Sequence, residues 1–317
     1  MAKNGIDEQS ELVTLDIKNS VAHITINRPE AMNALNQDVI TQLDKQFTDA
    51  EKNDSVKGIV IRGAGKTFIA GADIKFFINN IKNNTINNII SFTRKGHELF
   101  LRIENSNKVT IALLHGLSLG GGSELALSAQ AIVATPAGSM GFPETGIGIY
   151  PGLGGMIRLA HHVGPELTKY YVFTGKSIKA EEAYELGIIT RLVPSEEMDY
   201  AIKEIIAAGK PDKYKKRKIP SKYNPFIEMC SGRNIDKMLA RSEPEGVEKE
   251  LAAKTQKAMS IRAPLAIRFA NELIDKQITV PIPDAIELEL GRLNDIFSTE
   301  DALAGLTTLG KTEFEGK

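Results

Sequence analysis

One stretch of the sequence, HGLSLGGGSELALSAQ from His115, offers two kinds of chemistry. The first is nucleophilic, because GLSLG fits the pattern G-x-S-x-G with Ser118 at its centre. In a nucleophile elbow the helix starts directly after the serine, whereas three glycines follow here. Such an elbow also needs a late histidine, and the last ones are His161 and His162. We therefore interpret Ser118 as a loop or packing residue.

The second kind of chemistry is general acid–base catalysis by carboxylates. Glu124 follows the glycines Gly120–Gly122, and Glu144 stands 20 residues later (144 − 124 = 20), after Pro143 in FPETGIGIYPGLGG. Because an interior glycine costs about 1 kcal/mol relative to alanine, we expect the helix after the glycines to begin near Ser123. Each glutamate on its own has a second interpretation. Glu124 suits a helix N-terminus, where the dipole stabilises a carboxylate, and Glu144 suits a surface loop.

Two loops of small residues have the composition of an anion-binding site. The triple glycine follows a predicted buried strand and opens a helix, where unpaired N–H groups attract negative charge. Taken alone, it is slightly better explained by close packing in a tight turn. The loop Ala70–Gly71–Ala72, in KTFIAGADIKFF, also follows a predicted strand. Two such loops can each aim one N–H at a single oxygen, which is the geometry of an oxyanion hole.

The elements that must position these loops alternate between strands and helices. Val21–Pro29 alternates apolar and polar residues, which predicts a strand ended by the proline, and Val56–Gly63 predicts a buried strand. Helical spacing is present in Asn33–Asn53, where Leu35, Ile40, Leu43 and Phe47 share a face, and around Ile89–Ile103. Repeated strand–helix alternation predicts an α/β fold with mostly parallel pairing.

Composition limits the class of protein further. The chain has 317 residues, of which 42% are hydrophobic and 25% charged, with a formal net charge of -1. These values are typical of a globular protein and show no electrostatic footprint for nucleic acid or an anionic membrane. The single cysteine, Cys230, excludes an intrachain disulfide framework and a multi-cysteine metal site. The polar N-terminus resembles no secretory signal, so we expect a cytoplasmic protein.

The sequence divides into three predicted parts. Residues 1–204 are predicted as a core domain, 205–245 as a linker or insertion, and 246–317 as a C-terminal helical region. The second part is rich in lysine and proline and lacks periodicity up to residue 226. We interpret its KYKKRK run as a solvated surface segment rather than a nucleic-acid patch.

Four ordered motifs carry a resemblance to a known family. INRPEAMNALN, FIAGADIK, HGLSLGGGSELAL and FPETGIGIYPGLGG together resemble the enoyl-CoA hydratase/isomerase (crotonase) superfamily, continuously from about Val13 to Pro194 and weakly after Ala263. The resemblance implies a spiral of ββα units with a C-terminal helical trimerisation region. It also implies an acyl-CoA thioester substrate, no separate cofactor or metal, and a homo-trimer or homo-hexamer built as a dimer of trimers.

The resemblance also implies roles for individual residues. The backbone N–H groups of Ala72 and Gly121 match the oxyanion donors. Glu124 matches the glutamate that orients and activates water, and Glu144 the one that exchanges a proton at Cα. The positions that match contacts to CoA or line the acyl site are Ala31, Ala70, Gly71, Asp73, Ile74 and Gly152, and Lys311 is a candidate for contact with the CoA of a neighbouring subunit.

These matches predict a short-chain enoyl-CoA hydratase, which adds water reversibly and syn to a 2-enoyl-CoA and can run as a 3-hydroxyacyl-CoA dehydratase. Hydrolase relatives tend to lack the first glutamate, and isomerases usually keep only one of the two. A 3-hydroxyacyl-CoA thioester hydrolase and a non-catalytic CoA-binding or scaffold protein stay as alternatives. Phe76 and Phe77 favour a short acyl pocket, with core packing as their alternative role.

Overall fold

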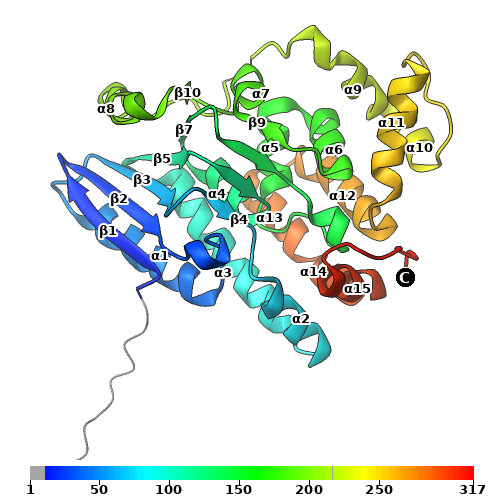
Figure 1. Ribbon diagram of the computed structural model, residues 1–317, viewed down its shortest axis with the longest axis horizontal. Helices are drawn as coiled ribbons and strands as arrows, with labels where there is room; N and C mark the ends of the chain where they lie inside the picture. Colours follow the sequence, from blue (N-terminus) through cyan, green and yellow to red (C-terminus); the bar gives the residue numbers. More distant parts are fainter. Residues whose placement is uncertain (1–10, 216) are drawn as a thin grey trace, which may run out of the picture.

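A computed structural model describes residues 11–215 and 217–317, and Figure 1 shows its main sheet beside helical layers. The polar stretch 1–10 and one lysine of the KYKKRK run lie outside the described residues. The main sheet has six strands in the order β1-β2-β3-β5-β7-β10. Their bounds are β1 (Val13–Lys18), β2 (Val21–Ile26), β3 (Gly58–Gly63), β5 (Val109–Leu114), β7 (Ala131–Ala134) and β10 (Arg191–Leu192). Only the β1–β2 pair is antiparallel among these described strands.

Helices cover both faces of this sheet at its central strands β3, β5 and β7, which explains why these strands are almost continuously apolar and buried. Along β3, Ile59 and Ile61 belong to the large core shared with α1 and α3, whereas Val60 faces a smaller core beneath α8. Successive residues of a strand point to opposite faces, so a strand covered on both sides has no polar alternation. The helices named here are α1 (Gln37–Lys52), α3 (Ile86–Asn105) and α8 (Met198–Ala208).

A second, four-stranded sheet brings the two small-residue loops together. Its order is β4-β6-β8-β9, with β4 (Ile69–Ala70), β6 (Leu117–Leu119), β8 (Ser139–Gly141) and β9 (Ile178–Lys179). β4 and β6 are parallel, and Ala70 pairs with Leu119. Because the carboxyl ends of parallel strands meet at one edge of a sheet, the loop after β4 lies beside the glycines after β6.

The remaining helices follow in chain order. They are α2 (Ile74–Lys82), α4 (Gly121–Ser128), α5 (Gly155–Val163), α6 (Pro165–Thr174), α7 (Ala180–Glu185), α9 (Asn224–Met229), α10 (Gly232–Leu239), α11 (Lys249–Ser260), α12 (Pro264–Gln277), α13 (Ile282–Leu290), α14 (Leu293–Phe297) and α15 (Glu300–Thr308). The short 3₁₀ helices are η1 (Pro29–Ala31), η2 (Glu144–Ile147), η3 (Ser195–Glu197) and η4 (Ser221–Tyr223). None of the helices in the described part of the chain is long and apolar enough to cross a lipid bilayer.

The predicted fold class is confirmed, with two local corrections. Helix α4 begins at Gly121 and not near Ser123. Close packing overrides the poor helix propensity of glycine, because a Cβ on Gly122 would lie 2.0 Å from the carbonyl oxygen of Ile69. Ser118 lies in strand β6 rather than in a loop; it is fully buried, and its carbonyl oxygen accepts a hydrogen bond from Ser123 Oγ. Its interpretation as a packing residue stands.

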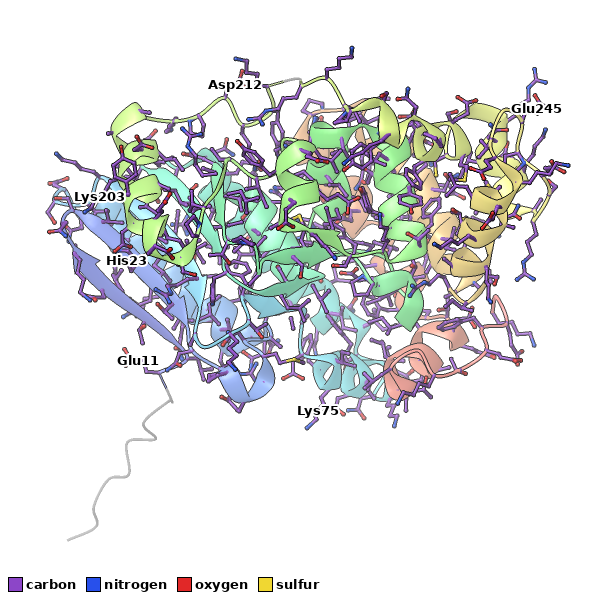
Figure 2. The ribbon with its side chains drawn as sticks, turned by 45° about the horizontal axis from the view of Figure 1, so that its top comes forward. Glu11, His23, Lys75, Lys203, Asp212 and Glu245 are labelled. Atoms are coloured by element: carbon purple, nitrogen blue, oxygen red, sulfur yellow. The ribbon has the colours of Figure 1, made fainter. Side chains whose placement is uncertain are left out.

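The segment predicted as a linker or insertion contains helices of its own. α8 continues to Ala208, and α9 and α10 lie inside the 205–245 range. In Figure 1, α8 lies at one end of the molecule and α9, α10 and α11 at the other, so residues 209–220 connect the two ends. Figure 2 places Asp212 of this connection on the surface. The three-part domain division stays a prediction.

Candidate active site

A cavity of about 200 Å³ lies where the β4 and β6 loops meet. Its lining is mostly apolar, with two carboxyl groups among the side chains. The residues are Ala70, Gly71, Ala72, Ile74, Phe77, Phe92, Thr93, Leu119, Gly120, Gly121, Glu124, Pro143, Glu144, Ile147, Ile149, Tyr150, Gly152, Leu153, Leu293 and Phe297. A mostly apolar cavity with a few convergent polar groups is the usual form of a small-molecule site.

Two backbone amides border this cavity from neighbouring loops. Leu35 forms an isolated parallel β-bridge with Ala72. In this bridge Leu35 N donates to Gly71 O at 2.9 Å and Asp73 N donates to Leu35 O at 2.8 Å, so the N–H of Ala72 itself takes no part. Among the described residues, none accepts a hydrogen bond from Ala72 N. Gly121 is the first residue of α4, where an N–H has no partner inside the helix. The two loops lie in contact, because a Cβ built on Gly120 would lie 3.8 Å from Gly71 Cα and one built on Gly121 would lie 3.7 Å from the carbonyl carbon of Gly71.

Glu124 is held in the first turn of α4 by the loop before α5. Its Oε1 accepts hydrogen bonds from Leu153 N at 2.8 Å and from Gly155 N at 2.9 Å. Burial raises the pKa of Glu124 to about 8, the negative charge of Glu289 adds to the rise, and the two amides oppose it. Both hydrogen bonds go to one oxygen, so Oε2 keeps its capacity to accept a hydrogen bond from water.

Glu144 opens η2 and is buried rather than exposed in a surface loop. Only 8% of the residue is accessible, and its Oε2 has no hydrogen-bond partner in the described structure. Burial raises the pKa of Glu144 well above its ordinary value, and the charge of Glu124 adds to the rise. A carboxyl group in this state can carry a proton at neutral pH and donate it.

The glycine before α4 leaves the space that Glu144 occupies. Gly120 has φ 47, a left-handed value that favours glycine, and a Cβ at this position would lie 2.4 Å from Glu144 Oε1. The triple glycine therefore does more than form a turn. Gly120 leaves room for the carboxyl group of Glu144, Gly121 borders the cavity with its backbone amide, and Gly122 packs against strand β4.

The other predicted site residues divide into two groups. Ala70, Gly71, Ile74 and Gly152 line the cavity, as do Ala72 and Gly121. Ala31, Asp73 and Lys311 are not among the lining residues. Asp73 caps α2 by accepting from Lys75 N at 3.2 Å, and its carboxylate lies 3.5 Å from Arg28 Nη2. Ala31 lies in η1, and Lys311 follows α15.

Sequence reasoning named one wall of the cavity, Phe77, and missed other walls and their supports. Phe77 lines it, whereas Phe76 packs against Phe77 and Phe92 with ring centroids 5.7 and 5.2 Å apart. Phe297 comes from α14 and lies 5.2 Å from the Phe77 ring. Glu289 on α13, which contacts the loop that holds Glu124, is also missed. Neither Phe297 nor Glu289 lies in a motif, so the sequence held no signal that could have found them.

Comparison with known proteins defines the family. The model of the family "Enoyl-CoA hydratase/isomerase" matches residues 21–310, and the chain therefore belongs to this family. The chain is 32% identical over 309 residues to a short-chain-enoyl-CoA hydratase of Clostridium acetobutylicum, covering 96% of this chain and 97% of that protein. It is 37% identical over 196 residues to a crotonyl-CoA hydratase of Syntrophomonas wolfei, covering 62% and 74%.

Solved structures agree with this assignment at the level of the fold. The crystal structure of an enoyl-CoA hydratase from Rhodobacter sphaeroides is similar with a TM-score of 0.81 and 22% identity, covering 96% of this chain and 93% of that one. The predicted resemblance to the crotonase superfamily is confirmed.

Proposed function

We propose that this protein is an enoyl-CoA hydratase that acts on short-chain 2-enoyl-CoA thioesters. One observation carries the proposal: two buried carboxyl groups with raised pKa values line the same cavity as two backbone amides from separate loops. This is the combination that hydration of a thioester-conjugated double bond needs. The names of the two relatives described above support the same reaction.

In the proposed mechanism, the amides of Ala72 and Gly121 bind the thioester carbonyl oxygen. They draw electrons toward that oxygen and make Cβ more electrophilic. Glu124 removes a proton from a water molecule as the water oxygen bonds to Cβ, and the thioester takes enolate character. Glu144 then delivers its proton to Cα, which completes the syn addition. The pair titrates as a unit, because each charge influences the other.

The size of the cavity supports a short acyl group. Its volume of about 200 Å³ is bounded by aromatic rings from three helices, Phe77 on α2, Phe92 on α3 and Phe297 on α14. A crotonyl group has four carbons, whereas a long acyl chain requires these packed rings to move. The matching positions Ala70, Gly71, Ile74 and Gly152 are proposed to contact the CoA or the acyl group. Ala31, Asp73 and Lys311 keep this proposed role on the family resemblance alone.

The deciding experiment follows two signals from purified protein and crotonyl-CoA. Loss of enoyl absorbance reports hydration, and a thiol reagent reports free CoA. We expect rapid loss of absorbance without thiol release. Thiol release from crotonyl-CoA with the double bond intact, or from 3-hydroxybutyryl-CoA assayed in parallel, indicates the alternative thioester hydrolase. Binding of crotonyl-CoA with neither signal indicates a CoA-binding or scaffold protein.

Three broader features of the proposal rest on the family resemblance. The reaction needs no cofactor besides the CoA that is part of the substrate, so we expect full activity after treatment with EDTA. We propose assembly into a trimer or a hexamer, which light scattering can measure against the 34.6 kDa chain. Exposed apolar side chains in the C-terminal helical part, Ile261 and Leu309, are consistent with such contacts. A cytoplasmic location stays a prediction.

A further inference from the structure

A third buried carboxylate, Glu289 on α13, lies behind the cavity and does not line it. The residue is completely inaccessible. Its Oε1 accepts a hydrogen bond from Gly154 N at 2.8 Å and lies 3.2 Å from His97 Nε2. Its Oε2 accepts from Gln277 Nε2 at 3.0 Å. A buried carboxylate is costly unless such partners compensate it, and nothing in the proposed reaction uses this one directly.

The loop that Glu289 holds is the one that holds Glu124. Three successive amides alternate between the two carboxylates: Leu153 N and Gly155 N donate to Glu124, and Gly154 N donates to Glu289. Gly154 has φ 84, and a Cβ there would lie 2.3 Å from Arg158 Nη1. The loop is therefore fixed in a conformation that favours glycine, between side chains from α4, α13 and α5.

The main chain of Glu289 also reaches the cavity wall. Tyr150 lines the cavity, and its hydroxyl donates to the carbonyl oxygen of Glu289 at 2.8 Å. One residue of α13 thus contacts both the loop that orients the glutamate and a ring that shapes the site.

We propose that Glu289 is a positioning residue for the hydration reaction: through Gly154 N it fixes the Leu153–Gly155 loop and thereby the carboxyl group of Glu124. This inference rests on the proposed function and deepens it. A displacement of about 1 Å at the reacting groups can cost on the order of 100-fold in rate, so a fixed loop has catalytic value.

Glu289 also adds charge to the site. Its carboxylate is the second cause, after burial, of the raised pKa of Glu124, and it contributes to the raised pKa of Glu144. The other charged groups around Glu124 are Glu144 from η2 and Arg158 from α5, and His97 from α3 faces Glu289. Removing the charge of Glu289 while keeping its shape lowers the pKa of Glu124.

Two substitutions separate position from charge. Glu289→Gln keeps a side-chain oxygen that can accept the hydrogen bond from Gly154 N. The new amide nitrogen needs an acceptor, and Gln277 Oε1, which has no partner among the described residues, can supply one if the amide of Gln277 flips. We expect this variant to retain most of kcat while the acid limb of its kcat/KM profile moves to lower pH. Glu289→Ala removes the acceptor, so we expect kcat to fall roughly 100-fold with KM little changed.

The matched control is Glu287→Gln, two residues away on α13. Glu287 is exposed and pairs with Arg94, so we expect its removal to leave kcat and the pH profile unchanged. Thermal unfolding of all variants shows whether each is folded. If Glu289→Ala is folded and keeps wild-type kcat, the inference is wrong while the hydratase proposal stands.

A measurement without turnover keeps the two proposals separate. Infrared difference spectra of protein labelled with ¹³C-carboxyl glutamate follow the ionisation of Glu124, which is assigned by the band missing in Glu124→Gln. We expect the Glu124 band to titrate at lower pH in Glu289→Gln than in wild type. Should the wild-type protein hydrate no enoyl-CoA, this titration still decides whether Glu289 acts on Glu124, and a band that is unmoved in both Glu289→Gln and Glu289→Ala overturns the inference.

Discussion

The two glutamates that line the cavity face opposite requirements of stability and chemistry. Glu124 is only 2% exposed, and two amides do not fully compensate the water that its carboxylate loses. The result is a carboxyl group that gives up its proton near the pH at which an enzyme works. Such a group is useful to a reaction and unfavourable to folding, which is the usual compromise at active sites.

This compromise predicts that Glu124→Gln stabilises the protein at high pH. The unfolded chain ionises this glutamate near 4.5 and the folded protein at about 8, so between these values the folded state binds more protons. Stability therefore falls as pH rises through this window. The glutamine can still accept from both amides without ionising. We expect the variant to gain stability over wild type progressively from pH 4.5 to 8, by at most about 1.4 kcal/mol for each unit of the pKa shift.

Chemical denaturation at a series of pH values measures this gain. The exposed Glu30→Gln is the control and should leave the difference in stability flat across the same window. An equal stability of Glu124→Gln and wild type at pH 5 and at pH 8 contradicts the raised pKa.

Whereas Glu124→Gln should gain stability, substitution of either glutamate should lower activity. Glu124→Gln loses the base and Glu144→Gln loses the proton donor, so we expect each to lower kcat by roughly 100- to 10,000-fold. Binding of acetyl-CoA, measured by calorimetry, should change little, because the proposed oxyanion donors are backbone groups. Unchanged turnover in both variants contradicts the assigned roles.

At the scale of elements, the site depends on how closely helix α4, which follows strand β6, packs against the neighbouring parallel strand β4. All eight residues of α4 are buried, so this helix is fixed on every side. Its second residue, Gly122, packs against the carbonyl of Ile69 on β4, and this contact sets how closely the loops of Ala72 and Gly121 approach. The oxyanion site is thus a property of packing between backbones.

We therefore expect Gly122→Ala to disrupt the site without touching a glutamate. The new methyl would lie 2.0 Å from a backbone oxygen, so β4 and α4 must move apart. Overpacking of this kind costs typically about 1–3 kcal/mol, and the separated amides should lower kcat. Denaturation and steady-state kinetics measure both effects. Gly141→Ala on the neighbouring β8 is the control, because its methyl meets the flexible end of Leu119 at 3.3 Å, and equal behaviour of the two variants contradicts this account.

At the scale of the whole molecule, a buried ionic cluster connects the 205–245 segment to the loop beside the active site. Glu104 on α3 binds Arg158, with Nη2 at 2.9 Å, and also Lys213 and Tyr214 from the connection after α8. Arg158 Nη1 in turn lies 3.4 Å from Leu153 O, in the loop that holds Glu124. The segment after α8 is therefore attached to helix α3 of the core by an ion pair from Lys213 and a hydrogen bond from Tyr214.

This cluster predicts a large effect of Glu104→Gln on stability. Burial alone would raise the pKa of Glu104, but Arg158 and Lys213 lower it to about 2. Its stabilising contribution is thus present above pH 4.5 and is lost as pH falls toward 2. The substitution leaves two buried cations without their partner, which typically costs about 3–5 kcal/mol.

Denaturation at pH 7 measures this loss, and exposed Glu98→Gln on the same helix is the control. A double-mutant cycle with Lys213→Met should show strong coupling. If Glu104→Gln is as stable as Glu98→Gln, the cluster does not hold the connection in place.

The sequence by itself determined the α/β class, the family and the identity of the candidate glutamates, because these depend on short motifs whose residues are close in the chain. FIAGADIK and LGGGSEL each carry their glycines and their functional group within one loop. The start of α4 at Gly121 was not predictable, since the glycine at position 122 is required by Ile69, 53 residues earlier (122 − 69 = 53).

Only the tertiary structure decided how these groups support one another. It placed Glu289 against the loop of Glu124, 165 residues away (289 − 124 = 165), and Phe297 against Phe77. Neither residue belongs to a motif, and each works only through contacts between distant elements. Burial in those contacts, rather than residue type, is also what raises the pKa of Glu124 and Glu144, because desolvation depends on everything that surrounds a carboxyl group.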